Sequence, residues 1–183
     1  MLIRIIPVGK VSQNILKAIV TEISGIYELR AKILPAIELT QNEYNIWRRQ
    51  YNAEKIIEKL KRSGGMHIDQ SIPCIGITEE DIYYNGLNFV FALEEPLEGV
   101  GIVSTFRLRE EFYGNAPDFS KLIERTLKEI LHILGHLLGL EHCKNEKCVM
   151  SFSPSVSHID LKEFRFCDSC ELKLTAKGIN IEP

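Results

Sequence analysis

The chain has 183 residues, of which 45% are hydrophobic and 26% are charged, and its formal net charge at pH 7 is −3. This composition predicts one folded domain with a sizeable core, and it excludes a disordered, collagen-like or coiled-coil chain. The slightly acidic balance gives no electrostatic reason to expect a nucleic-acid partner. No basic leader precedes an apolar run, and no run approaches the ~18 apolar residues of a membrane span. We therefore expect a cytoplasmic monomer with no membrane partner.

The first elements follow a simple alternation. Residues 2–9 have the apolar pattern of a buried strand, residues 12–27 have helical spacing with Ser12 as the N-cap, and residues 27–37 suit a second strand. A strand, a helix and a strand in such a short stretch form a βαβ unit. The pattern therefore predicts a parallel pair of strands joined by a right-handed crossover.

The rest of the predicted sheet follows a second helix. This helix ends near Lys61, where Gly64 and Gly65 stop it. Three strand-like runs come next, at 71–78, 87–95 and 99–108. Together these patterns predict an α+β fold with a twisted, mixed and mostly parallel five-stranded sheet and about three helices.

A long helical pattern at 120–139 carries two histidines that are four residues apart. Positions with this spacing lie one above the other on a helix, so His132 and His136 can bind one metal ion. Gly139 can adopt a left-handed turn that brings His142 to the same ion. Three nitrogen ligands leave the fourth position of zinc open, as in catalytic sites. The alternative is three unconnected histidines on an amphipathic helix, and their spacing disfavours it.

Four of the five cysteines form two closely spaced pairs near the C-terminus. Cys143 and Cys148 form a C-x4-C pair, and Cys167 and Cys170 form a C-x2-C pair. Two such pairs are typical of a closed structural zinc site, in which the metal itself stabilises a small segment. One alternative is a disulfide, which a reducing compartment disfavours. The other is a redox pair, which is disfavoured because no thioredoxin-like strand leads into "CDSC". The fifth cysteine, Cys74, is expected to be a buried core thiol.

His142 and Cys143 are adjacent in the sequence. Successive side chains of an extended chain point to opposite sides, so one backbone step could serve both metal sites. We therefore predict that the cysteine site anchors the third histidine.

These motifs resemble the archaemetzincins, a branch of the metzincin zinc peptidases. The family pattern is HExxHxxGxxH followed directly by a cysteine, then by a second cysteine, a methionine and a CxxC. The matching positions are His132, His136, Gly139, His142, Cys143, Cys148, Met150, Cys167 and Cys170. The upstream stretches "RRQYNAEKII", "IGITEEDIYYNGLNFVFALE" and "GVGIVSTFRL" are similar to the family as well, so the resemblance covers most of the chain.

The resemblance implies two zinc ions, one catalytic ion held by the three histidines and one structural ion held by the four cysteines. It also implies a Met-turn at Met150 and a single domain over residues 1–183. In this domain, 1–139 would hold the sheet and the active-site helix, and 140–183 would hold the third histidine, the Met-turn and the cysteine site. A peptide substrate would lie antiparallel to an edge strand, for which residues 99–108 are the candidate.

The chain departs from the family pattern at Ile133, where the family has a glutamate. In the family this glutamate takes a proton from the attacking water and passes it to the leaving amine, and isoleucine can do neither. Loss of a positioned general base typically lowers the rate by ~10²–10⁴-fold. Glu129, Glu141 and His158 are the candidate substitutes. Their alternative roles are solvent exposure and, for Glu129, support of a ligand histidine.

The sequence therefore predicts a zinc metallopeptidase of archaemetzincin type, weak or inactive because of Ile133, with a peptide or protein as its partner. The first alternative is a catalytically silent, zinc-dependent peptide-binding protein. The second is a zinc-ribbon interaction module, and the scarcity of basic residues beside Cys167 disfavours nucleic acid as its target.

Overall fold

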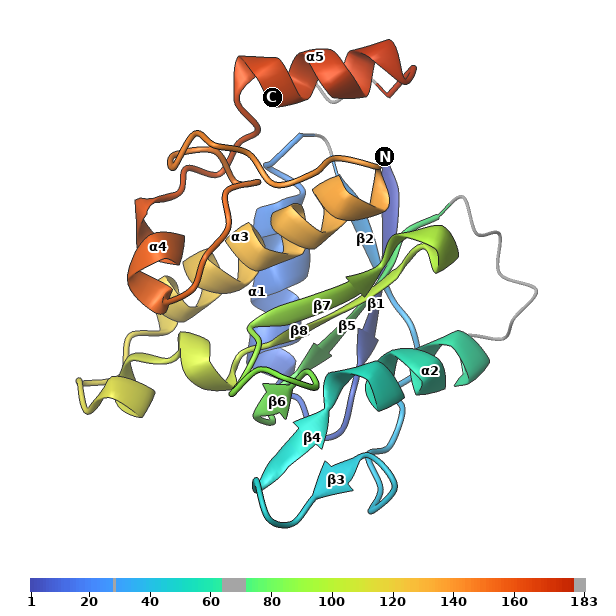
Figure 1. Ribbon diagram of the computed structural model, residues 1–183, viewed down its shortest axis with the longest axis vertical. Helices are drawn as coiled ribbons and strands as arrows, with labels where there is room; N and C mark the ends of the chain where they lie inside the picture. Colours follow the sequence, from blue (N-terminus) through green and yellow to red (C-terminus); the bar gives the residue numbers. More distant parts are fainter. Residues whose placement is uncertain (28, 64–71, 180–183) are drawn as a thin grey trace.

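A five-stranded sheet forms the centre of the computed structural model, which describes residues 1–27, 29–63 and 72–179. The strands lie in the order β2-β1-β5-β8-β7 (Figure 1). Neighbouring strands are parallel except for β7, which is antiparallel to β8. The predicted mixed, mostly parallel sheet is thus confirmed. Its strands are β1 Leu2–Pro7, β2 Arg30–Ile33, β5 Cys74–Thr78, β7 Ala92–Glu95 and β8 Val100–Ser104.

Helices cover both faces of this sheet (Figure 1). Helices α1 (Gln13–Ile23) and α3 (Phe119–Leu137) pack on one face, and α2 (Ala53–Ser63) packs on the other. One apolar cluster joins α1, α3 and the C-terminal segment to the sheet, and a second lies under α2. The residues of β5 and β8 are all buried, as expected for parallel strands that are covered on both faces.

The predicted βαβ unit is present but shorter than its sequence pattern. Ser12 caps α1, and its hydroxyl accepts a hydrogen bond from the Asn14 amide at 3.3 Å. Strand β2 runs parallel to β1, although the continuous strand covers only Arg30–Ile33 of the expected residues 27–37. Helix α2 continues to Ser63 in the described part of the chain. Gly64 and Gly65, the predicted stop, lie outside the described residues.

The prediction that residues 99–108 form the edge strand is wrong. Strand β8 lies between β5 and β7, and β7 is the edge. The cause is the short 3₁₀ turn Pro96–Glu98, after which Gly99 adopts a left-handed φ of 65°. This turn folds the chain back antiparallel and places Ala92–Glu95 outside β8. The edge next to the histidines is therefore the strand that precedes the predicted one.

Several short elements were not predicted. A small sheet has the order β3-β4-β6, and two helices follow α3 in the C-terminal segment, with α5 lying at the end of the molecule (Figure 1). Their bounds are β3 Tyr44–Asn45, β4 Gln50–Asn52, β6 Ile82–Tyr83, α4 Val156–Leu161 and α5 Asp168–Ala176, with further 3₁₀ turns at Phe106–Leu108 and Glu110–Tyr113. None of the helices that the structure describes combines the length and apolar character needed to cross a bilayer.

Candidate metal centre

The helix that carries the first two histidines has a well-defined beginning and end. The side chain of Asp118 caps α3 by accepting a hydrogen bond from the Lys121 amide at 2.9 Å. At the other end, Gly139 has a φ of 82° and donates its amide to the His136 carbonyl at 2.9 Å. The Leu140 amide bonds back to the Gly135 carbonyl at 2.8 Å, which completes a Schellman motif. The predicted left-handed turn at Gly139 is confirmed.

This turn brings the third histidine to the first two. The ligand atoms of His132, His136 and His142 all lie within 4.8 Å of one another. The Nδ1 atoms of His132 and His136 each lie 2.8 Å from a backbone carbonyl, that of Val149 and that of Leu140. Protonated Nδ1 atoms leave both Nε2 atoms with free lone pairs, and these Nε2 atoms are only 3.1 Å apart.

The donor atoms of the three histidines fit a zinc ion. Two imidazole ligands of tetrahedral zinc, each bound at ~2.0–2.1 Å, would be roughly 3.4 Å apart. The two facing Nε2 atoms come close to that spacing, and a cation between them would satisfy two lone pairs that otherwise repel. Burial lowers the pKa of all three histidines, which keeps the imidazoles neutral as metal binding requires.

Two apolar side chains support α3 from different sides. Ile133 is fully buried and packs on β8, where a Cβ atom added to Gly101 would lie 2.6 Å from Ile133 Cγ2. Met150 is also fully buried and lies directly against Gly135, between the two helical histidines. The methionine therefore packs against the helix turn that carries His132 and His136.

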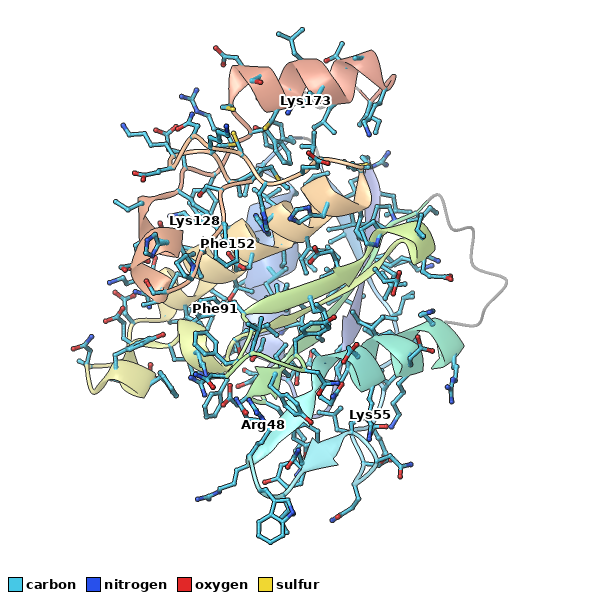
Figure 2. The ribbon with its side chains drawn as sticks, viewed as in Figure 1. Arg48, Lys55, Phe91, Lys128, Phe152 and Lys173 are labelled. Atoms are coloured by element: carbon cyan, nitrogen blue, oxygen red, sulfur yellow. The ribbon has the colours of Figure 1, made fainter. Side chains whose placement is uncertain are left out.

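A cavity of about 500 Å³ opens beside His132 and His142. One wall is the continuous segment 87–94, which leads into β7, and the other is the C-terminal segment at Phe152–Pro154. Phe91 and Phe152, which line it from these two segments, are labelled in Figure 2. The cavity thus joins the edge strand to the histidine cluster, and it is large enough for the side chains of a peptide.

Glu129 lines this cavity and is buried, so solvent exposure, one of its two alternative roles, is wrong. Its Oε1 atom lies 3.5 Å from Nζ of Lys162, and the Lys162 side chain is fully buried. The same Nζ atom lies 3.5 Å from His132 Nδ1. Burial raises the pKa of Glu129 and lowers that of Lys162. Glu129 is therefore held in an ion pair next to a histidine.

The other two sequence candidates are not among the residues that line the cavity. Glu141 is exposed. His158 is exposed on α4, where its Nδ1 atom lies 2.8 Å from the Ser155 hydroxyl, and it does not line the cavity.

The structure adds a carboxylate that the sequence reasoning missed. Oε1 of Glu94, on β7, lies 3.9 Å from His136 Nε2, and Glu94 lines the cavity. Burial raises the pKa of its carboxyl group, and the nearby His142 opposes this rise. The alternation of side chains along β7 could have indicated which glutamate faces the histidines. That inference required knowing that β7 is the edge strand facing α3.

The four clustered cysteines also converge. The Sγ atoms of Cys143 and Cys167 are 3.7 Å apart, and those of Cys148 and Cys170 are 3.8 Å apart. Tetrahedral zinc with thiolate bonds of ~2.3 Å places its sulfur ligands roughly 3.8 Å apart, so this group fits a structural zinc ion. Cys74, the fifth cysteine, is buried in the core as expected.

Comparisons with known proteins agree with this geometry. The model of peptidase family M54 matches residues 5–176. The archaemetzincin of Methanocaldococcus jannaschii is 41% identical over 175 residues, which cover 96% of this chain and 93% of that protein. The chain belongs to the archaemetzincin family. A second archaemetzincin, from Pyrococcus furiosus, is 37% identical over 94% of this chain and 92% of its own length.

Solved structures share the fold. The crystal structure of the Archaeoglobus fulgidus archaemetzincin in complex with malonate aligns with a TM-score of 0.79 and 34% identity, over 94% of this chain and 99% of that one. A zinc-dependent peptidase from Methanocorpusculum labreanum aligns with a TM-score of 0.82 and 29% identity, with the same coverage. The predicted α+β metzincin-like fold is confirmed.

Proposed function

We propose that this archaemetzincin-family protein is a zinc-dependent peptidase that hydrolyses peptide bonds beside the three histidines. The observation that carries the proposal is the pair of facing Nε2 atoms of His132 and His136, 3.1 Å apart, next to a cavity that adjoins an edge strand. His142 would be the third ligand. When bound there, zinc supplies a Lewis acid that acidifies water and polarises a carbonyl group. The four clustered cysteines would hold a second, structural zinc ion.

Strand β7 would bind the peptide. It is the last strand of its sheet, so its outer edge presents backbone amide and carbonyl groups to a ligand. An extended peptide can add to such an edge as a further strand. The aromatic rings of Phe91 and Phe152 line the adjoining cavity and would contact the peptide's side chains. These features support a peptide or protein as the substrate.

Ile133 supports a second candidate, a silent peptide-binding protein. The family resemblance assigns proton transfer to this position, and the isoleucine side chain has no atom that accepts a proton. It is fully buried against β8. Without another base, the zinc site would bind a peptide with little turnover, because a general base typically contributes ~10²–10⁴-fold.

A cleavage assay with a ligand-binding arm tests these functions. The zinc-loaded protein is incubated with a library of fluorogenic peptides, and its affinity for a peptide hydroxamate is measured in parallel. We expect the parent to cleave peptides and to bind the hydroxamate, and we expect His142→Ala to lose both activities. His158→Ala alters an exposed histidine outside the cavity and should retain both. Binding without cleavage would favour the silent protein. Absence of both would overturn the proposed function.

A further inference from the structure

We propose that Glu94 is the general base of this protein and performs the proton transfer that Ile133 cannot perform. This inference rests on the proposed peptidase function. It assigns a catalytic role to an edge-strand residue outside the histidine motif, and it predicts that the chain is active as it stands.

The carboxylate of Glu94 lies next to the nitrogen atoms of the three histidines but is not part of that group of ligands. Its Oε1 atom is 3.9 Å from His136 Nε2. Among the described residues, the group of atoms that all lie within 4.8 Å of one another contains the three histidines and not Glu94. A general base must lie within hydrogen-bond reach of the attacking water without occupying a ligand position itself. The position of Glu94 fits this role better than it fits the role of a fourth ligand.

Glu94 also lies near Ile133. In the antiparallel ladder between β7 and β8, Glu94 lies directly opposite Gly101. Ile133 packs on this same glycine. Directly opposite residues of an antiparallel pair project to the same face, so the Glu94 side chain projects toward α3 beside Ile133. A carboxylate is thus present near position 133, supplied by the sheet instead of the helix.

The alternation along β7 gives the same orientation independently. Ala92 packs against the apolar cluster on the α3 side of the sheet, whereas Leu93 packs against the cluster on the α2 side. Side chains alternate along a strand, so Glu94 shares the face of Ala92 and Glu95 shares that of Leu93. Two adjacent glutamates therefore face opposite sides, and only Glu94 faces the histidines.

Glu94 is the more available of the two carboxylates that line the cavity. The other, Glu129, is held by Lys162, and its side chain is only 5% exposed. The Glu94 side chain is 25% exposed, and in the described part of the chain no lysine or arginine lies within ion-pair distance of it. Its oxygen atoms are thus free to accept a proton from a ligand in the cavity.

The proposed step is a balanced hydrolysis. The oxygen of water forms a bond to the carbonyl carbon of the peptide, and one of its protons passes to Glu94 Oε1. The C–N bond then breaks, and Glu94 returns the proton to the leaving nitrogen. The products are a carboxylic acid and an amine, and Glu94 ends as the carboxylate that began the cycle.

The test compares Glu94→Gln and Glu94→Ala with the parent and with His158→Ala, all zinc-loaded. We expect kcat to fall by ~10²–10⁴-fold in both Glu94 variants and to be unchanged in His158→Ala, which alters an exposed histidine outside the cavity. Added formate should restore part of the activity of Glu94→Ala, because it can enter the space left by the carboxylate, and should not restore Glu94→Gln. Zinc affinity, measured by chelator competition, should change by less than threefold.

Each contrary result has a distinct meaning. Full cleavage by Glu94→Gln would overturn the base role and leave the peptidase function intact. A loss of zinc affinity by tenfold or more would overturn it as well, because Glu94 would then be a ligand. A parent that binds the peptide hydroxamate without cleaving peptides would overturn the base role and support the silent protein. A parent that does neither would overturn both proposals.

Discussion

Replacement of Gly135 by alanine tests how closely Met150 supports the metal site. Gly135 lies on α3 between His132 and His136. A Cβ atom at this position would overlap Met150 Sδ, and it would lie 2.9 Å from Phe166 Cε1 and 3.1 Å from Met150 Cε. Met150 and Phe166 are 0% and 1% exposed, so neither can move into solvent. The new methyl group must therefore displace packed core side chains.

The expected cost is the difference between two effects. Overpacking of a core typically costs about 1–3 kcal/mol, and contacts with two buried side chains favour the upper end of this range. Alanine stabilises a helix relative to glycine by about 1 kcal/mol. The net loss in the free energy of unfolding for Gly135→Ala is then about 2 kcal/mol. For a chain of this length it corresponds to a fall in Tm of roughly 4–8 °C.

A double-mutant cycle in urea, at constant zinc content, measures the effect. Zinc must be held constant because a ligand of the folded state stabilises it by mass action. Met150→Ala removes the overlapping sulfur atom, so Gly135→Ala should cost at least about 1 kcal/mol less in that background than in the parent. An equal cost in both backgrounds, or no cost in the parent, would refute the assignment of Met150 as the close support of α3.

Two further predictions concern the cysteine site and acid stability. Cys167→Ser should weaken zinc binding at the histidines by about tenfold, which is comparable to the loss of a residue that orients a metal ligand. Chelator competition measures this affinity, and Cys74→Ser, which lies outside the cysteine cluster, is the control. An unchanged affinity would disprove the coupling of the two sites through His142. Hydrogen bonds from Lys121, Asn115 and Arg125 lower the pKa of Glu110 from its usual 4.5 to about 2. A lowered pKa stabilises the fold above pH 4.5, and this contribution is lost as the pH falls toward 2. Tm measured against pH should therefore vary less in Glu110→Gln than in the parent over this range, and an identical profile would contradict the assignment.

The sequence predicted the elements whose signals are local. Ser12 marks the start of a helix, Gly139 marks the end of another, and the spacing of His132 and His136 shows that both lie on one side of α3. Each of these follows from the residue itself and from helix geometry. The convergence of the three histidines was predictable because short spacings limit where the side chains can lie. The meeting of the two cysteine pairs, which are far apart in the chain, was predicted instead from the pattern typical of four-cysteine zinc sites.

The edge strand and its glutamate could not be predicted in this way. The order of β8 and β7 depends on the turn that ends at Gly99, and nothing in the apolar run 99–108 indicates that a neighbouring strand covers it. Strands β3, β4 and β6 are two or three residues long, too short for a periodic pattern. The burial of Lys162 beside Glu129 also depends on contacts between distant parts of the chain.

The position of Glu94 depends on the register of the hairpin between β7 and β8. The pairing of Glu94 with Gly101 and of Glu95 with Val100 decides which glutamate faces the histidines. A shift of one residue would turn every β7 side chain to the other face of the sheet. A shift that brings Glu95 opposite Gly101 would exchange one carboxylate for the other, whereas a shift in the opposite direction would place Leu93 there. The direction of such a shift therefore decides whether an acidic or an apolar side chain faces the histidines at this position.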